Sequence, residues 1–350
     1  MSTNIRQPKY FTSEQVAEVL TWSLVNSAVE EALIATGTTQ ANAKESYAIQ
    51  PARSVTPCGD YSQRLLVMPG YVGNYQLSEN GDRINTLACK VVTSFACNQN
   101  LQPPLPNILA NILLFCPQTG QLQCIMDGTQ ITAWRTASAS IVATKYLFLK
   151  RFPQGIEKPI KVAIIGCGVQ GQSHALGMCK TFNVIDISLW NRTKSKADNL
   201  ANKLRAEFPN GLNVQVSDRP QDAVEDADVI CIGTYAPNAL ISYVMLKGGD
   251  VHINSVGGGQ VHFREVSQDI YDYAVVYVDS LVSVKNQLQV LKATIHGELG
   301  AVIRNRGELR RDGRITIFQS LGIAAEDATV AQAVYDTLTN ANIKTIHGSK

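Results

Sequence analysis

Hydrophobic positions follow two different patterns along the chain, and the change falls near Pro159. Thr12-Ser13-Glu14-Gln15 is typical of a helix start, and apolar residues recur after it at helical spacing. Short β-like runs separated by turn formers come next, at residues 64–68, 87–95, 109–115 and 122–126. Successive strands without long helices between them predict an antiparallel or mixed sheet.

Residues 129–150 have the pattern of a helix, which Pro153 and Gly155 follow. Strands and helices alternate from residue 161 onward, with strands expected at 162–165, 185–190, 214–216, 229–233, 252–256 and 275–278 and helices at positions such as 195–208 and 220–227. This alternation predicts an α/β fold whose second part is a Rossmann-type, doubly wound parallel sheet. A last helix is expected over residues 324–338.

Composition fits a globular protein of about two domains, because 45% of the 350 residues are apolar and 17% are charged. The net charge is +2 without a basic block, so charge does not favour nucleic acid or membrane as a partner. The N-terminus has no apolar signal segment, and no apolar run is long enough to span a bilayer. The eight cysteines lack metal-ligand spacing, so free thiols, no metal site and a cytoplasmic location are expected.

A glycine-rich turn, Gly166-Cys-Gly168-Val169-Gln170-Gly171, directly follows the apolar strand that ends at Ile165. Gly166 permits a tight turn, Gly168 lets the backbone approach a pyrophosphate, and Gly171 lets the next helix pack on the strand. The N-terminus of that helix offers N–H groups and a positive dipole to phosphates. Strand, turn and helix together predict a dinucleotide-binding unit, with Val169 and Gln170 among its contacts.

The end of the second strand of this unit indicates which dinucleotide binds. NAD sites usually have Asp or Glu there, for the ribose hydroxyls. This chain has Asn191-Arg192-Thr193 followed by Lys194-Ser-Lys196, without a carboxylate. A ribose phosphate suits such a set, so we predict NADP(H) with Asn191, Arg192 and Thr193 as contacts. The alternative is a solvated basic turn that also accepts NAD(H).

Three cations in the first 135 residues stand out as substrate ligands: Arg53, Lys90 and Arg135. Lys90 lies inside an apolar strand, where an ammonium group is costly without an anionic partner. Taken singly, each of the three is more often a surface or salt-bridge residue.

Several segments together are similar to one family, the ornithine cyclodeaminase and mu-crystallin family. They run in family order from about residue 10 to about residue 340, and they are Gln50-Pro-Ala-Arg-Ser-Val, Cys89-Lys-Val-Val-Thr-Ser-Phe, Met126-Asp-Gly-Thr-Gln-Ile-Thr-Ala-Trp-Arg-Thr-Ala, Gly166-Cys-Gly-Val-Gln, Leu189-Trp-Asn-Arg-Thr-Lys, His252-Ile-Asn-Ser-Val-Gly, Tyr277-Val-Asp-Ser and Phe318-Gln-Ser-Leu-Gly-Ile-Ala-Ala-Glu-Asp.

The resemblance implies a homodimer with two domains. Residues 1–130, completed by 323–350, would be an α+β domain for substrate binding and dimerisation, and residues 131–322 would bind the nucleotide. The family's carboxylate-binding cations fall on Arg53, Lys90 and Arg135. The resemblance also puts further residues near the cofactor, namely Thr136, Thr234, Val256, Gly257, Ser320 and Leu321.

One departure from the family's pattern affects the expected reaction. Cyclodeaminases have an Asp after the Val-Gly-Gly turn, where this chain has Gly259, which has no side chain for acid–base work. With the turn at Asn191, this favours an NADPH-dependent reductase of carboxylate-bearing imines, such as piperideine or thiomorpholine carboxylates. Lys90 would orient the substrate and supply the proton to nitrogen.

Two alternatives to the ketimine reductase stay open at this stage. The first is an opine-type dehydrogenase, of the tauropine or alanopine type, that joins an amino compound to a 2-oxo acid. The second is a binding protein, because some members of the family are associated with thyroid hormone or with bulk lens roles. Two further residues are expected in supporting positions: His174 in the helix near the phosphates, and Asp279 either lining the site or capping the next turn.

Overall fold

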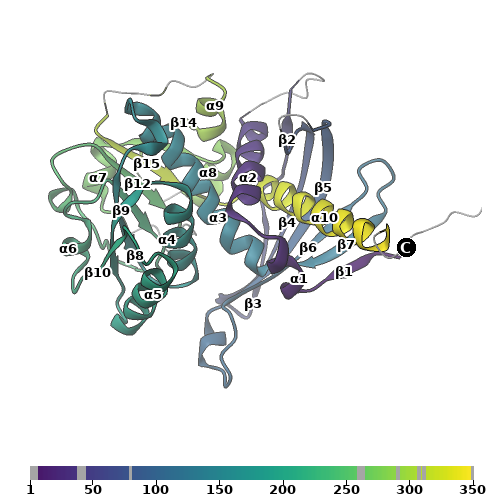
Figure 1. Cartoon of the computed structure of the whole chain (residues 1–350), viewed down its shortest axis with the longest axis horizontal. Coiled ribbons are helices and arrows are strands. Elements are labelled where there is room, and N and C mark those ends of the chain that lie inside the picture. Colours follow the sequence, from purple (N-terminus) through teal and green to yellow (C-terminus); the bar gives the residue numbers. More distant parts are fainter. Residues whose placement is uncertain are drawn as a thin grey trace, which may run out of the picture. The chain divides into compact units, whose positions relative to one another are not determined.

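The computed structural model describes residues 7–37, 45–78, 81–257, 265–288, 292–305, 309 and 313–347. The chain divides into two compact units (Figure 1). Unit 1 comprises Met1–Arg135 together with Ile323–Lys350, and unit 2 comprises Thr136–Gly322.

Unit 1 is built on a seven-stranded sheet in the described part of the chain. The path of neighbouring strands is β1 (Lys9–Phe11), β7 (Leu122–Asp127), β6 (Ile108–Phe115), β5 (Ile84–Phe95), β4 (Asp60–Tyr75) and β2 (Tyr47–Ile49), and β3 (Ser54–Cys58) also pairs with β4. β4 to β7 pair antiparallel and β1 pairs parallel with β7, so the predicted mixed sheet is confirmed. β4 and β5 are longer than predicted.

Helices α1 (Ser13–Val19), α2 (Trp22–Thr36) and α10 (Ala324–His347) complete unit 1 (Figure 1). The predicted helix start is a capping box in which Thr12 and Gln15 bond each other's backbone N–H groups. The expected single helix breaks at Leu20, and Thr21 caps the second piece through the Leu24 N–H at 3.2 Å. α10 begins at the predicted residue and packs on α2, β4 and β5.

Alternation along the strands gives the sheet of unit 1 a buried and an open face. On β5 the buried positions are Thr86, Ala88, Lys90 and Val92, so one charged residue lies in an otherwise neutral row. The alternate positions stay partly exposed although many are apolar, as on β5 and β6 at Leu87, Val91, Leu109, Leu113 and Phe115. Leu109 is 38% exposed.

Unit 2 contains an eight-stranded sheet whose paired strands are all parallel in the described residues. Its order is β10 (Asn213–Val216), β9 (Val184–Trp190), β8 (Ile160–Ile165), β11 (Val229–Ile232), β12 (Val251–Ser255), β15 (Ile315–Gln319), β13 (Val275–Val278) and β14 (Ile295–Glu298). The strand order reverses between β8 and β11, which is the crevice where doubly wound folds bind ligands. The predicted α/β fold is confirmed, but β14 and β15 were not predicted.

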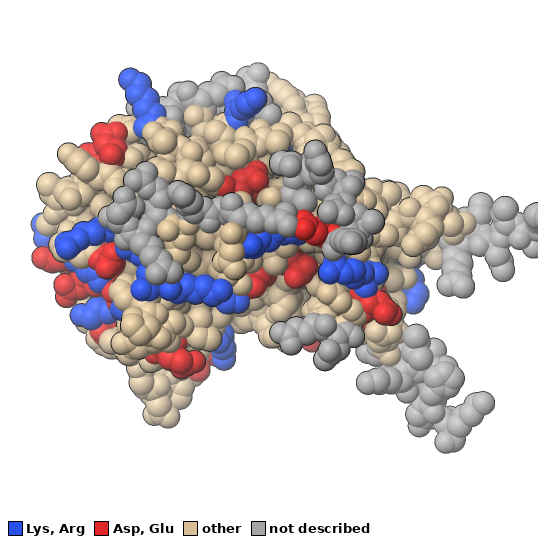
Figure 2. All heavy atoms as spheres, turned by 90° about the horizontal axis from the view of Figure 1, so that it is seen from above, with Lys and Arg blue, Asp and Glu red and all other residues tan. Residues whose placement is uncertain are grey.

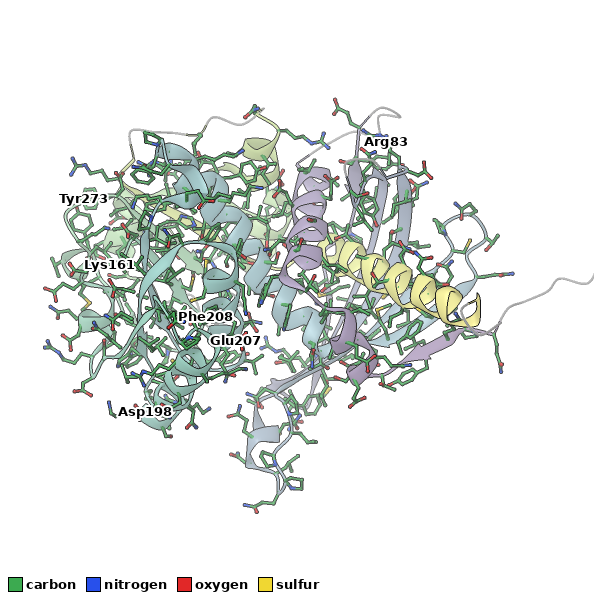
Figure 3. The ribbon with its side chains drawn as sticks, in the orientation of Figure 1. Arg83, Lys161, Asp198, Glu207, Phe208 and Tyr273 are labelled. Carbon is green, nitrogen blue, oxygen red and sulfur yellow. The ribbon has the colours of Figure 1, made fainter. Side chains whose placement is uncertain are left out.

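The helices of unit 2 in the described residues are the end of α3 (Thr129–Ala143), which begins in unit 1, α4 (Val169–Thr181), α5 (Lys194–Glu207), α6 (Pro220–Val224), α7 (Gln268–Tyr273), α8 (Leu281–Gln287) and α9 (Leu299–Ile303). α3 continues into a π-helical turn, Thr144–Phe148, and a 3-10 turn, Leu149–Arg151, where one helix was predicted. Glu207 and Phe208 lie together at the end of α5 (Figure 3), where Lys180 of α4 contacts both.

Charged side chains of both signs are interspersed on the face that Figure 2 shows. Within the described ranges, no helix combines the length and the apolar character that crossing a bilayer requires.

Candidate active site

The predicted glycine turn joins β8 to α4 beside the strand reversal. Gly166 has a φ of +100°, and a Cβ on Gly171 would lie 1.8 Å from the Gly166 carbonyl oxygen, so both positions require glycine. A Cβ on Gly168 would meet no described atom within 4 Å. Val169 and Gln170 form the first turn of α4, and no side chain caps that helix. The open backbone at Gly168 and the uncapped helix start fit a pyrophosphate.

The loop after β9 contains the residues predicted to select the dinucleotide. The Asn191 side chain accepts a hydrogen bond from the Cys167 N–H at 2.9 Å and donates one to the Thr193 carbonyl at 2.9 Å. Asn191 therefore links the loop to the glycine turn, a role that the sequence did not reveal. Arg192 and Thr193 are exposed at the start of α5, and the Thr193 side chain does not cap that helix. This cationic, uncapped start fits a ribose phosphate.

The loops after β11 and β12 contain Thr234, Val256 and Gly257, as expected from the strand ends. Both loops bond to Glu265, a buried residue that the sequence did not single out. The Glu265 carboxylate accepts hydrogen bonds from the Thr234 N–H, at 2.5 Å, and from the Thr234 hydroxyl. It also accepts one from the Gly257 backbone.

The last predicted cofactor residues, Ser320 and Leu321, follow β15. Their loop is held by Asp279, whose carboxylate accepts hydrogen bonds from the Leu321 and Gly322 N–H groups at 2.7 Å each. Asp279 is fully buried and holds a loop that is distant in sequence, which is neither of the two roles considered for it. Unit 2 therefore gathers the predicted residues at the carboxyl ends of β8, β9, β11, β12 and β15.

Unit 1 contains the predicted cations Arg53, Lys90 and Arg135. Lys90 is 2% exposed, and its Nζ lies 2.7 and 2.8 Å from the two carboxylate oxygens of Asp327. The anionic partner that a buried lysine needs is thus supplied by α10. From the sequence, Asp327 was expected only to lie in the last helix, residues 324–338.

Arg135 joins the same cluster from α3. Its Nε donates to Asp327 at 3.2 Å, and its Nη1 donates to Glu326 at 3.0 Å. The preceding residue, Trp134, stacks on Trp22 of α2 with ring centroids 4.2 Å apart, which ties the start of α3 to α2. Thr136, next on α3, is buried at the start of unit 2.

The cluster has an electrostatic bias toward an anion. Its five side chains, Arg53, Lys90, Arg135, Glu326 and Asp327, comprise three cations and two carboxylates. Burial, and then the nearby charge of Arg135, lower the pKa of Lys90 to about 8, although Asp327 opposes the shift. Arg53 is also close enough to lower this pKa. At neutral pH Lys90 is therefore mostly protonated but able to release its proton.

Two histidines of unit 2 have supporting positions. The His174 ring nitrogens lie 2.8 Å from the Gln170 carbonyl and 2.9 Å from the Ser140 hydroxyl, so His174 links α4 to α3. Burial lowers the pKa of His174 to about 4, which keeps the ring neutral and agrees with its expected role as a helix residue. His252 bonds Thr316 on the neighbouring strand β15 and Asn254 on its own strand β12.

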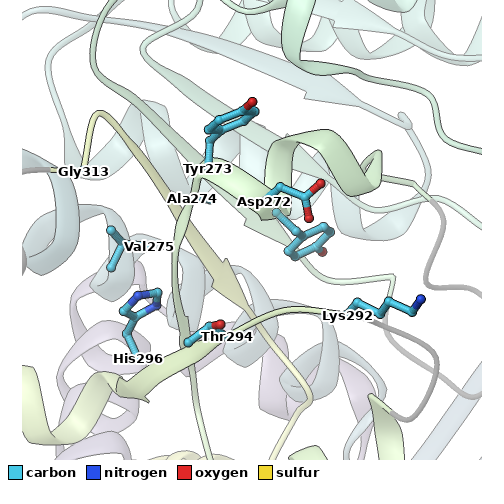
Figure 4. A pocket seen from close by; sticks show the side chains of 9 residues that line it. Asp272, Tyr273, Ala274, Val275, Lys292, Thr294, His296 and Gly313 are labelled. Atoms are coloured by element: carbon cyan, nitrogen blue, oxygen red, sulfur yellow. The ribbon is translucent and has the colours of Figure 1, made fainter.

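Unit 2 also contains a cavity of about 580 Å³ (Figure 4). Its lining includes Tyr273, Lys292 and His296, and none of the predicted site residues lines it. Gly259, on which the expected loss of cyclodeaminase chemistry depends, lies outside the described residues.

Comparisons with known proteins show which family this chain is similar to. The model of the ornithine cyclodeaminase/mu-crystallin family matches residues 8–342. Ketimine reductase mu-crystallin from Mus musculus is 33% identical over 335 residues, which are 95% of this chain and 98% of the relative. A Δ(1)-pyrroline-2-carboxylate reductase from Bacillus cereus is 30% identical over 304 residues, covering 82% of this chain and 86% of the relative.

Among solved structures, the Δ(1)-pyrroline-2-carboxylate reductase of Thermococcus litoralis in complex with NADH and L-proline is similar to this chain. The TM-score is 0.79 at 26% identity, and the match covers 95% of this chain and 98% of the other.

Proposed function

The chain belongs to the ornithine cyclodeaminase/mu-crystallin family, and on this premise we propose that it reduces the C=N bond of a small imine that carries a carboxylate. The observation that carries the proposal is the buried Lys90, held between Asp327 and a cluster of arginines. The names of the ketimine and pyrroline-2-carboxylate reductases among its relatives support the same reaction class. Cyclic ketimines are the substrate class that we favour.

Arg53 and Arg135 bind the substrate carboxylate in this proposal. Guanidinium groups suit carboxylates because they donate two parallel hydrogen bonds. Glu326 and Asp327 fix the Arg135 side chain from one side, so the guanidinium is oriented before a substrate arrives. The surplus of one positive charge over the five side chains is what a single carboxylate neutralises.

Lys90 is the proton donor to the imine nitrogen. Its Nζ is protonated at neutral pH because its pKa of about 8 lies above 7, and that pKa is low enough for ready transfer. Asp327 keeps the ammonium group in place through both carboxylate oxygens. A bound nicotinamide supplies the hydride that adds to the imine carbon.

We favour NADP(H) as the dinucleotide, held by the glycine turn and the loop after β9. Arg192 and Lys194 give that loop positive charge where NAD sites have a carboxylate. Replacing Arg192 with Ala is expected to raise the KM for NADPH about tenfold and to leave that for NADH nearly unchanged. Equal effects on both cofactors would contradict the preference.

We also propose that two copies associate through the open face of the sheet in unit 1. Leu109, Leu113 and Phe115 give this face the apolar character of an obligate interface. Light scattering is expected to give the mass of a dimer, and Leu109→Glu, which puts a charge in the apolar face, is expected to give that of a monomer. A monomeric wild-type protein would refute this part.

The reaction is tested by following NADPH oxidation with five- and six-membered cyclic ketimines, each with and without its carboxylate. We expect turnover of the carboxylates and about a hundredfold loss without the carboxylate. Lys90→Met is expected to abolish turnover, whereas Lys203→Met, on the exposed side of α5, is the matched control. Turnover of taurine plus pyruvate, without activity on cyclic ketimines, would instead indicate an opine-type dehydrogenase.

A further inference from the structure

Glu265 holds two loops that we assign to the dinucleotide, and it lies in the chain between β12 and α7. Three donors converge on its carboxylate: the Thr234 N–H, the Thr234 hydroxyl and the Gly257 backbone N–H. The Glu265 backbone carbonyl also accepts a hydrogen bond from the Leu240 N–H at 2.9 Å. Glu265 is 2% exposed, so water cannot replace these bonds.

The space around the carboxylate is closely filled. A Cβ on Gly257 would lie 2.1 Å from Glu265 Oε2, so the approach of these two residues requires glycine at position 257. A Cβ on Gly233 would in turn lie 3.1 Å from Val256, which puts the two strand ends in direct contact. The carboxylate therefore lies where a small change in its bonding moves both loops.

The charge state of Glu265 decides how many of the three bonds it can form. An ionised carboxylate accepts from all three donors, whereas a protonated carboxyl must use one oxygen as a donor. Tyr271 of α7 is the titratable group that faces Glu265 among the described residues, and its hydroxyl donates to Gln319 at 2.8 Å. Burial raises the pKa of Tyr271, so Tyr271 stays neutral around neutral pH.

We propose that Glu265 is a positioning residue for the dinucleotide: its ionised carboxylate holds Thr234 and Gly257, which follow β11 and β12, in the binding conformation, and its protonation releases one donor and weakens binding. The proposal rests on the assignment of these loops to the dinucleotide in the proposed function. It does not depend on which imine is reduced.

The direction of the pH effect follows from the environment of Glu265. Burial raises the pKa of Glu265 to about 7, and the bonds from Thr234 and Gly257 oppose that shift. Above this pKa the ionised form predominates and binding is strongest. As the pH falls through this value, the protonated form accumulates and the affinity falls.

The test measures the Kd of NADPH and of NADH by nicotinamide fluorescence, without substrate, from about pH 6 to about pH 8.5. NADH is included because the ribose phosphate of NADPH itself titrates near pH 6. For wild-type protein we expect about fivefold weaker NADH binding at the acid end. The side chain at position 265 cannot titrate in Glu265→Gln, so the Kd of this variant for NADH is expected to be raised and constant over this range. Glu225→Gln, on an exposed residue, is the control.

A second variant keeps the test decisive if Glu265→Gln does not fold. Thr234→Val removes one donor that favours the ionised form, so the midpoint of the pH dependence is expected to move to higher pH. An unchanged midpoint in Thr234→Val, or full pH dependence in a folded Glu265→Gln, would overturn the proposal. If the wild-type protein shows the expected pH dependence of the Kd but does not reduce imines, the proposed reaction is wrong and the role of Glu265 stands.

Discussion

The pair formed by Lys90 and Asp327 allows a quantitative prediction for Asp327→Asn. The Lys90 Nζ lies 2.7 and 2.8 Å from the carboxylate oxygens, so the substitution removes a full negative charge in direct contact. At an effective dielectric constant of about 20, such a contact is worth about 4 kcal/mol, or about 3 pKa units. The pKa of Lys90 is therefore expected to fall from about 8 to the region of about 5.

The assay is kcat/KM for ketimine reduction as a function of pH, which reports groups of the free enzyme. Wild-type activity is expected to fall above about pH 8, as Lys90 loses its proton. In Asp327→Asn the midpoint of this alkaline loss of kcat/KM is expected to lie about 3 pH units lower. The kcat/KM at neutral pH is then about one hundredth of the wild-type value. Acidification is expected to restore part of it.

Glu326→Gln is the matched control. Glu326 precedes Asp327 in the chain and has the same charge, but its carboxylate contacts Arg135. The substitution is expected to raise the KM of the substrate while the alkaline midpoint stays in place. If the midpoint of Asp327→Asn stays near that of the wild type, the titrating group is not Lys90, and the assignment of the proton donor fails.

Three further outcomes follow from individual contacts. Gly171→Ala is expected to destabilise the protein by about 3 kcal/mol, because its Cβ would lie 1.8 Å from the Gly166 carbonyl oxygen. Chemical denaturation measures this change, and a denaturation midpoint equal to that of the wild type would contradict the turn geometry. Asp279→Ala removes the oxygen that accepts both N–H groups, so the Kd of NADPH is expected to rise about tenfold in fluorescence titration. The pKa of Lys90 is lowered from its ordinary value of 10.5 to about 8, so between these two pH values the unfolded chain keeps a proton that the folded chain has lost. The free energy of unfolding of the wild type relative to Lys90→Met is therefore expected to rise by about 3 kcal/mol as the pH increases through this range, and a constant difference between the two proteins would refute the burial argument.

The fold was largely predictable because its signals are local. The glycine turn, its preceding strand and its following helix lie within 22 consecutive residues, from Ile160 to Thr181, and Gly166 and Gly171 each have a steric reason. β14 was missed because Ile295–Glu298 is short and contains Gly and Glu, so it lacks the apolar run of a buried parallel strand. The break between α1 and α2 was missed because apolar residues continue at helical spacing through Leu20.

The partners of the charged residues were not predictable, because they lie far apart in sequence. Lys90 and Asp327 are separated by 237 positions, and no local pattern near Lys90 indicates which carboxylate it meets. Glu265 and Thr234 are separated by 31 positions, and Glu265 follows a loop with no helical or strand pattern of its own. For Lys90 the sequence indicated a residue that needs a partner, whereas Glu265 was not singled out, and in both cases only the fold identified the pair.

These carboxylates also explain how each unit can bind an anionic ligand although it contains buried acidic residues. Asp327 bonds to Lys90 and Arg135, and Glu265 bonds to backbone N–H groups and a hydroxyl. The charge of each carboxylate is therefore compensated by the donor groups that it orients. A buried carboxylate with such bonds is less costly than an isolated one, and it fixes donors that would otherwise need to be ordered during binding. Because the pKa of Lys90 is about 8 and that of Glu265 about 7, we expect proton donation to decline on the alkaline side and dinucleotide binding on the acid side. The pH optimum of turnover at low dinucleotide concentration should therefore lie between these two values, and saturating dinucleotide should broaden it on the acid side alone.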